Sequence, residues 1–205
     1  KGYGAEVTLC PPTLASREEF MQQIIEEKAA TPIHPYNHKD VILGQSTCAQ
    51  ELLEQAKNLD YIIAPVGGGG LLSGTLLACS YFAPQVKVIA GEPAGADDAY
   101  RSWKAGELIP QTGPNTIADG LLTSLGDLTY PIIMEHVSEI IRVDDEAIRK
   151  AMKIIWERMK IIIEPSCAVP LAVVTENKEK FKGKRVGLIL TGGNVDLKKA
   201  LELIA

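Results

Sequence analysis

The run Gly67-Gly68-Gly69-Gly70, the glycine loop, constrains the fold of this chain more than any other feature of its sequence. An apolar segment over residues 61–66 leads into it, and a segment rich in apolar and small residues follows over 71–82. This order predicts a strand, a glycine turn and a helix. Glycines place no side chain in the way of a ligand, and their N–H groups can turn inward beside the positive end of the helix dipole. The glycine loop therefore predicts a binding site for one phosphate group.

The surroundings of the glycine loop restrict the kind of phosphate. No Lys-Ser or Lys-Thr pair closes the loop, as a P-loop would require, and its spacing is not the G-x-G-x-x-G of a dinucleotide site. A phosphate that is not part of a nucleotide is therefore the favoured ligand. The alternative is a turn without a ligand, whose glycines only let a helix pack closely on a sheet.

Apolar strand-like segments alternate with helix-like segments along most of the chain. This alternation predicts an α/β fold, in which helices flank a parallel, twisted sheet. Ser16, with Glu19 three residues later, is predicted to cap the first helix. Asp144 is predicted to cap a later, long helix that carries a stripe of apolar residues facing the core. The members of that stripe are Ile148, Met152, Ile155 and Met159. Strands are predicted at 5–10, 61–66, 86–91, 138–143 and 185–191, and helices at 16–30, 41–58, 71–82, 95–105, 129–136, 144–160, 166–177 and 196–204.

Composition excludes some functions and favours a compartment. The chain has 205 residues and a net charge of −5, which does not favour nucleic acid as a partner, and no apolar run is long enough for a membrane span. The four cysteines are scattered and form no Cys-x-x-Cys pair, which is typical of reduced thiols in a cytoplasmic protein. We expect a cytoplasmic protein that binds neither nucleic acid nor membrane.

Four polar or glycine-rich segments follow predicted strands or lie in a loop that can reach the same edge. They are the glycine loop, residues 92–98, residues 118–120 and residues 191–194. Each alone is a weak signal, because an isolated acid or a Gly-Gly-Asn turn is common at a strand end. Open parallel sheets bind ligands outside the carboxyl ends of their strands, so together these segments predict one site at that edge.

Five strings, PVGGGGLLSG, GEPAGADD, TIADG, WERMKIIIEPS and ILTGGNVDL, resemble the serine racemase and serine/threonine ammonia-lyase family. The resemblance is collinear over nearly the whole chain. It implies a fold-type II enzyme that uses pyridoxal 5′-phosphate, with a fold like that of the tryptophan synthase β subunit. It also implies serine racemisation with associated β-elimination from serine or threonine, carried out by a homodimer.

The resemblance also shows what this sequence does not contain. The family holds its cofactor on a lysine in an S-x-K-x-R-G-like motif and carries an S-S-G-N-H-like loop, and this chain has neither. Residues 1–36 resemble the remnant of a small domain, and residues 37–205 resemble the C-terminal part of the large cofactor-binding domain. We therefore expect the C-terminal portion of a longer enzyme, without a catalytic residue of its own and inactive alone. The alternative is a non-catalytic truncated paralogue, or a fragment, that binds phosphate or a partner.

The resemblance assigns cofactor contacts to specific residues. The glycine loop would hold the phosphate, and the Thr191 hydroxyl would face the pyridine nitrogen, where a neutral group leaves the ring a milder electron sink than a carboxylate would. Glu164 would lie near the ring edge; alternatively it is an acid stabilised by a helix N-terminus. The full set implied is Gly67, Gly68, Gly69, Gly70, Leu71, Gly120, Glu164 and Thr191.

Further ligands follow from the same resemblance. Glu92, the Ala96 carbonyl and Asp98 would hold a divalent cation, Mg²⁺ or else Ca²⁺ or Mn²⁺, because hard oxygen ligands suit these ions. The alternative is that these acids lie at a helix N-terminus for its dipole. Contacts to the substrate carboxylate are implied for Arg17 and Thr123. Contacts to ATP, as an effector at the dimer interface, are implied for Lys160 and Asn194.

Overall fold

The computed structural model of the chain describes residues 2–11 and 13–205 and separates into two units, residues 1–34 and 35–205. The first unit holds the helix α1 (Leu14–Lys28). Thr13 is its N-cap, because the Thr13 hydroxyl accepts a hydrogen bond from the Ser16 N–H at 3.2 Å, so the predicted cap at Ser16 is wrong. The strand predicted at 5–10 is also wrong. A lone strand without a pairing neighbour is not stable, and these residues carry no regular structure.

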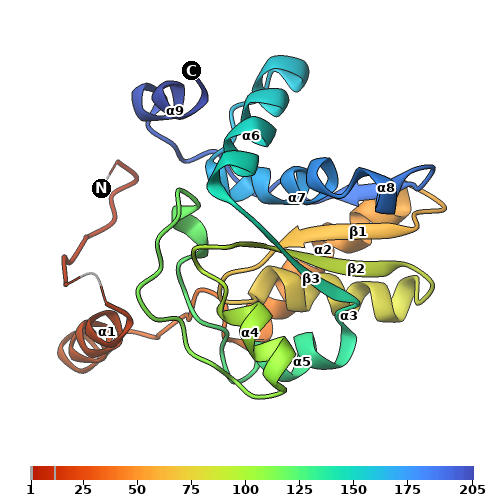
Figure 1. Cartoon of the computed structure of the whole chain (residues 1–205). Coiled ribbons are helices and arrows are strands. Elements are labelled where there is room, and N and C mark those ends of the chain that lie inside the picture. The colour runs from red at the N-terminus through yellow and green to blue at the C-terminus, as the bar shows by residue number, and fades with distance from the viewer. Residues whose placement is uncertain (1, 12) are drawn as a thin grey trace. The chain divides into compact units, whose positions relative to one another are not determined.

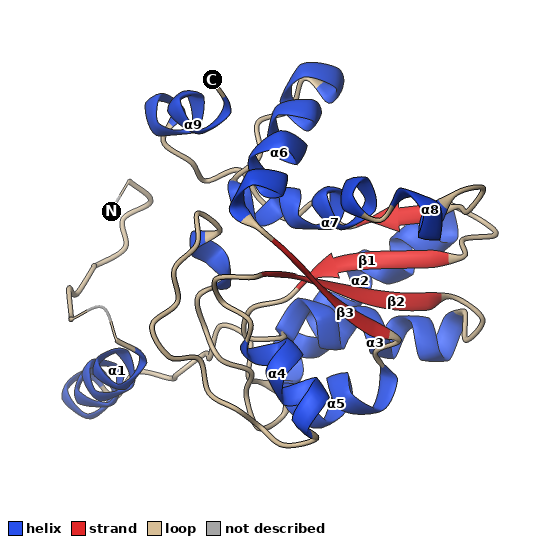
Figure 2. Cartoon of the chain, viewed as in Figure 1, coloured by secondary structure: helices blue, strands red, loops and turns tan. Residues whose placement is uncertain are grey.

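The second unit is built on a four-stranded sheet in the order β3-β2-β1-β4 (Figure 2). Every pairing in it is parallel; Ile63, for example, lies level with Ile89 on one side and Leu188 on the other. This arrangement confirms the predicted α/β fold. The strands are β1 (Tyr61–Pro65), β2 (Lys87–Pro93), β3 (Glu139–Val143) and β4 (Val186–Leu188).

Helices cover both faces of this sheet (Figure 1). One face carries α2 (Lys39–Gln55), α3 (Gly70–Phe82), α4 (Asp98–Ala105) and α5 (Thr129–His136). The other carries α6 (Asp145–Met159), α7 (Pro165–Glu176) and α8 (Lys178–Phe181), and α9 (Leu197–Ile204) packs on α6. A short 3-10 helix, η1 (Asp119–Leu121), lies in the long loop before α5. None of the helices in the described ranges is long and apolar enough to cross a membrane.

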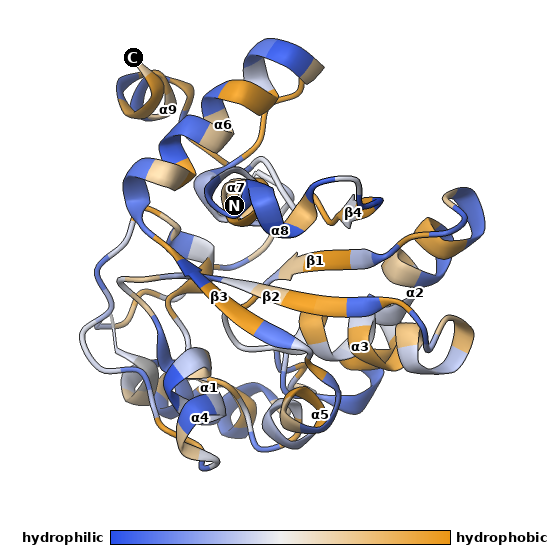
Figure 3. Ribbon diagram, turned by 45° about the vertical axis from the view of Figure 1, so that its right-hand side comes forward, coloured by the Kyte–Doolittle hydropathy of each residue, from blue (hydrophilic) through white to orange (hydrophobic). Residues whose placement is uncertain are grey.

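The two faces of the sheet bury two apolar cores. Successive strand residues point to opposite faces, so Ile63 packs toward α6 and α7 while its neighbour Ile62 packs toward α3. Strands β1 and β2 are accordingly hydrophobic along most of their length (Figure 3). Of the predicted stripe on α6, Ile148, Met152 and Ile155 are buried, but Met159 is 56% exposed because the helix ends there.

Several element boundaries differ from the predicted ones. Strand β2 runs on to Pro93, since its pairing with β3 extends to Val143, so Glu92 lies within the strand and not after it. Strand β4 is shorter than predicted, and its pairing with β1 ends at Leu188. Helix α4 begins at Asp98, after a turn, and the Asp144 side chain caps α6 as predicted by accepting from the Ala147 N–H at 2.8 Å.

Candidate active site

The glycine loop joins the end of β1 to the start of α3, and its four residues are buried. A side chain at Gly68 would overlap the ring of Tyr36. At Gly69, where φ is +89°, a Cβ would lie 2.8 Å from Ile133 Cδ1 and 2.9 Å from Thr129 Cβ. The chain itself therefore fills the space on the side-chain face of the loop, and only glycine fits at these two positions. Packing alone therefore requires glycine at both positions.

The backbone donors of the glycine loop have no protein acceptor. In the described part of the chain, the N–H groups of the four glycines make no hydrogen bond, whereas the carbonyls of Gly68 and Gly69 accept from the Thr129 hydroxyl and the Ser73 N–H, each at 2.8 Å. Buried backbone donors are nearly always paired in native proteins. Donors that are buried, consecutive and next to a helix N-terminus fit an anion. The residues present therefore fit a phosphate group at this loop.

The first turn of α7 holds two other loops in place. The Ser166 hydroxyl accepts from the Gly120 N–H at 3.0 Å, and the Cys167 sulfur accepts from the Thr191 N–H at 3.1 Å. The Glu164 N–H donates to the Gly192 carbonyl at 3.0 Å. These contacts bring η1 and the segment after β4 to the same end of the sheet.

The Glu164 carboxylate lies between these two loops. Its Oε2 accepts from the Asn194 N–H at 3.1 Å, and its Oε1 lies 3.4 Å from the Cβ position of Gly120. The Cβ position of Gly67 in turn lies 3.4 Å from the Gly120 carbonyl oxygen. The structure thus brings Gly67, Gly120, Glu164 and the segment around Thr191 together. Leu71 follows the glycine loop in the first turn of α3.

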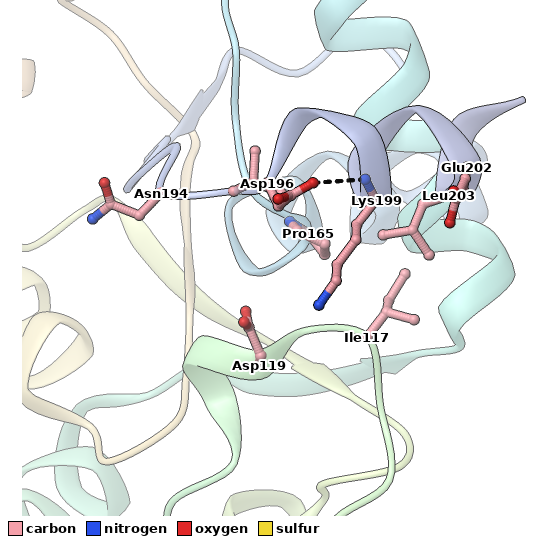
Figure 4. A pocket seen from close by; sticks show the side chains of 9 residues that line it. Ile117, Asp119, Pro165, Asn194, Asp196, Lys199, Glu202 and Leu203 are labelled. Carbon is pink, nitrogen blue, oxygen red and sulfur yellow. Dashed lines mark hydrogen bonds between the residues drawn. The ribbon is translucent and has the colours of Figure 1, made fainter. Parts of the chain in front are cut away.

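A cavity of about 430 Å³ opens beside this cluster (Figure 4). The Asp119 carboxylate and the Lys199 ammonium lie on opposite walls, and Asp196 accepts a hydrogen bond from the Lys199 N–H at 3.0 Å. Neither charged group forms an ion pair within the described residues. The remaining lining residues are Ile117, Pro165, Asn194, Val195, Glu202 and Leu203. A small molecule with charges of both signs fits such walls.

Glu92 and Asp98 are two carboxylates that are each 1% exposed. Glu92 accepts from the N–H groups of Ala99 at 2.8 Å and Tyr100 at 2.9 Å, and Asp98 accepts from the Leu125 N–H at 3.1 Å. Burial raises the pKa of Glu92 to about 8 and that of Asp98 to about 6. Glu92 thus accepts hydrogen bonds from two N–H groups in the N-terminal turn of α4.

The same two acids also fit a cation. Asp97 forms ion pairs with Arg101 at 2.9 Å and Arg142 at 2.7 Å, whereas no ion pair reaches Glu92 or Asp98 within the described ranges. At neutral pH the raised pKa of about 8 keeps Glu92 mostly protonated, so a divalent cation would have to displace this proton before both acids could serve as carboxylate ligands. Among the described residues, no three His, Cys, Asp or Glu side chains lie close enough together to hold a metal ion by themselves. Any further ligands would have to be backbone oxygens, such as that of Ala96, or waters.

The remaining predicted residues are Arg17, Thr123 and Lys160. Arg17 lies on α1 in the first unit and lines a groove there with Phe20. Thr123 is half-buried in the loop after η1. Lys160 ends α6 in a left-handed conformation at φ 60° and is exposed, and among the described residues no hydrogen bond joins it to Asn194.

The sequence alone did not indicate a role at the site for three further residues. The ring of Tyr36 packs on Gly68, the hydroxyl of Thr129 bonds to the Gly68 carbonyl at 2.8 Å, and Ser166 holds Gly120. Capping motifs and hydrophobic periodicity indicate only contacts between residues that are close in the sequence. Thr129 is 61 residues from its partner, so no local pattern could have indicated the contact.

A glycine-rich loop at the carboxyl end of a central strand lies where open parallel α/β sheets bind their ligands. Residues 1–192 match the family described as pyridoxal-phosphate dependent enzyme, and the chain belongs to that family. The chain is 53% identical to beta-hydroxyaspartate dehydratase of Paracoccus denitrificans over 96% of its length, and 52% identical to a serine racemase of Dictyostelium discoideum over 99%. It spans 62% and 64% of the length of these two relatives.

Solved structures agree with the sequence relatives. The crystal structure of the Dictyostelium discoideum serine racemase matches 95% of this chain, and 63% of its own, at 54% identity and a TM-score of 0.86. The structure of maize serine racemase matches 98% of this chain, and 63% of its own, at 42% identity and a TM-score of 0.92. These similarities confirm the predicted family and its fold-type II architecture.

Proposed function

We propose that this chain is the cofactor-binding portion of a pyridoxal-phosphate enzyme that acts on 3-hydroxy amino acids. The proposed reactions are racemisation of serine and β-elimination from serine, threonine or 3-hydroxyaspartate. The observation that carries the proposal is the row of buried N–H groups at the glycine loop, next to Gly120 and Glu164, for which the described residues provide no acceptor. The names of two relatives, a dehydratase and a racemase, support this substrate class.

Each residue of the site has a proposed part in this chemistry. The glycine loop and Leu71 would bind the phosphate, and Gly120 would let the backbone approach the ring. Thr191 offers a neutral hydroxyl to the pyridine nitrogen, and Glu164 lies near the ring edge. When bound, the cofactor withdraws electrons from Cα, which makes proton loss there possible. Arg17 and Thr123 would orient the substrate carboxylate.

The function is tested by assaying the protein that contains this chain with L-serine, L-threonine and 3-hydroxyaspartate. We expect D-serine, detected by chiral chromatography, or 2-oxo acids and ammonia, detected by coupled dehydrogenase assays, and both only with pyridoxal phosphate present. If the cofactor-loaded protein formed no product from any of the three substrates, the result would contradict the proposed activity and favour the non-catalytic alternative.

The divalent cation at Glu92, Ala96 and Asp98 is part of the same proposal. Asp98→Asn keeps the size of the side chain but removes a carboxylate that would bind the cation, so we expect Mg²⁺ affinity to fall at least tenfold, or about 1.4 kcal/mol. The thermal stabilisation by Mg²⁺ should fall with it, because a ligand stabilises the state that binds it. Isothermal titration calorimetry measures the affinity, and differential scanning calorimetry measures the thermal stabilisation. Asp97→Asn is the matched control, since Asp97 is already neutralised by two arginines. Equal Mg²⁺ affinity in both variants would contradict the cation site and leave the interaction of these acids with the helix N-terminus as their role.

Assembly, regulation and location complete the proposal. A homodimer is supported by apolar side chains that are 40–56% exposed around the end of α6, namely Ile154, Met159, Ile161 and Ile162. Lys160 lies among them in the sequence and Asn194 is exposed, which supports ATP binding at that interface. Unpaired cysteines support a cytoplasmic location. Sedimentation with and without ATP tests the first two of these statements.

A further inference from the structure

Thr129 is the one side chain whose hydroxyl bonds to the backbone of the glycine loop among the described residues. It is fully buried at the start of α5. Its Oγ1 donates to the Gly68 carbonyl at 2.8 Å and accepts from the Gly126 N–H at 2.9 Å. The Gly126 carbonyl also lies within reach of this hydroxyl, at 3.3 Å, but the contact with the Gly68 carbonyl is shorter and closer to the usual hydrogen-bond length.

The contact sets the direction of a neighbouring donor. In a trans peptide the carbonyl and the following N–H point in opposite directions, and the described chain has no cis peptide bond. With its carbonyl turned toward Thr129, the Gly68–Gly69 peptide must turn the Gly69 N–H away from Thr129. Without the hydroxyl, glycine on both sides would let this peptide rotate at little cost. We infer that Thr129 is a positioning residue that aims the Gly69 N–H at the phosphate.

The surroundings of Thr129 are built to keep it in place. Asn37 accepts from the Leu128 N–H at 3.0 Å and donates to the Asp127 carboxylate at 2.6 Å, which fixes the turn before α5. On the other side, the Ser73 hydroxyl donates to the Thr129 carbonyl at 3.4 Å and links α5 to α3. The hydroxyl therefore reaches the glycine loop from a rigid frame, which a positioning role requires.

The inference rests on the proposed function, and calorimetric titration of the chain with inorganic phosphate tests it. Thr129→Val keeps the shape of the side chain and removes the hydroxyl. We expect phosphate affinity to fall about tenfold, while Thr129→Ser, which keeps the hydroxyl, stays within about threefold of the original chain. Thr129→Ala offers a second hydroxyl-free variant should the valine chain not fold.

Thr75→Val is the matched control for a merely structural role. Thr75 is also fully buried, and its hydroxyl bonds to the Leu71 carbonyl at 2.9 Å, within a helix that already fixes that peptide. Both valine variants should lower the melting temperature, but only Thr129→Val should weaken phosphate binding. Unchanged phosphate affinity in the folded hydroxyl-free variants would overturn the inference and leave the phosphate site standing. A chain that binds no phosphate at all would overturn both.

Discussion

Gly69→Val is expected to abolish the retention of pyridoxal phosphate and to destabilise the fold. The backbone at Gly69 has φ +89°, which costs a residue with a side chain about 1–2 kcal/mol. The new methyl groups would meet Ile133 and Thr129, and overpacking of this kind costs about 1–3 kcal/mol. Any rotation that relieves the clash also turns N–H groups away from the phosphate, at about 1.5–3 kcal/mol for each charge-assisted hydrogen bond.

Cofactor titration and urea unfolding measure the two effects of Gly69→Val separately. Gly106→Val is the matched control, because Gly106 also has a positive φ, +73°, but nothing within 4 Å of its Cβ position. It should lose stability through strain and still bind the cofactor. Thr191→Ala should be milder for cofactor binding than Gly69→Val, since it removes one neutral hydrogen bond of about 1 kcal/mol. If Thr191→Ala lost the cofactor while Gly69→Val kept it, the glycine loop would be only a packing turn.

Gly95→Ala is expected to lower the free energy of unfolding by about 3 kcal/mol, the upper end of the usual cost of overpacking. The backbone carbonyl of Asn115 occupies the position of the new methyl group, and the Asn115 N–H donates to the Gly95 carbonyl at 2.8 Å. Neither group can move as a flexible side chain would. The substitution should therefore displace the long loop before α5 and, through the adjacent Ala96, weaken the binding of Mg²⁺.

Urea unfolding of a second glycine variant provides the contrast to Gly95→Ala. Gly44 lies within α2, is exposed and has nothing within 4 Å of its Cβ position. Gly44→Ala should therefore raise the free energy of unfolding by about 0.5–1 kcal/mol, because alanine loses less backbone entropy in a helix. If both variants changed the free energy of unfolding by equally small amounts, the loop that contains Asn115 would be able to move away from Gly95 at little cost.

Local signals in the sequence were sufficient for the central strand-turn-helix unit. An apolar strand, consecutive glycines and an apolar helix follow one another here, and together they predict a strand-turn-helix unit. Strand β1 and helix α3 begin and end within a residue of their predicted bounds. The Asp144 cap was also predictable, since capping depends on residues that are close in the chain. Strand ends were less predictable. The length of β2 depends on β3 and that of β4 on β1, and those partners lie far away in the sequence.

The candidate site shows the same division between local and long-range causes. The glycine loop and the acids of residues 92–98 were visible as short motifs. The contacts that bring the loops together were not, because they involve the first turn of α7, Tyr36 and Thr129. Residues 5–10 carry an apolar pattern that suits a strand, but within the first unit no strand pairs with them in the described ranges. A pattern indicates what a segment can form, and its neighbours decide whether it does.

Phosphate binding by the glycine loop is tested most directly by NMR on the chain labelled with ¹⁵N-glycine. Pyridoxal phosphate and inorganic phosphate should both shift the amide signals of Gly67, Gly68, Gly69 and Gly70, because these donors have no acceptor in the described protein. Pyridoxal, which lacks the phosphate, should leave them unchanged. Unshifted signals from these four glycines, in a chain that binds pyridoxal phosphate elsewhere, would contradict the assignment of the glycine loop as the cofactor's phosphate site.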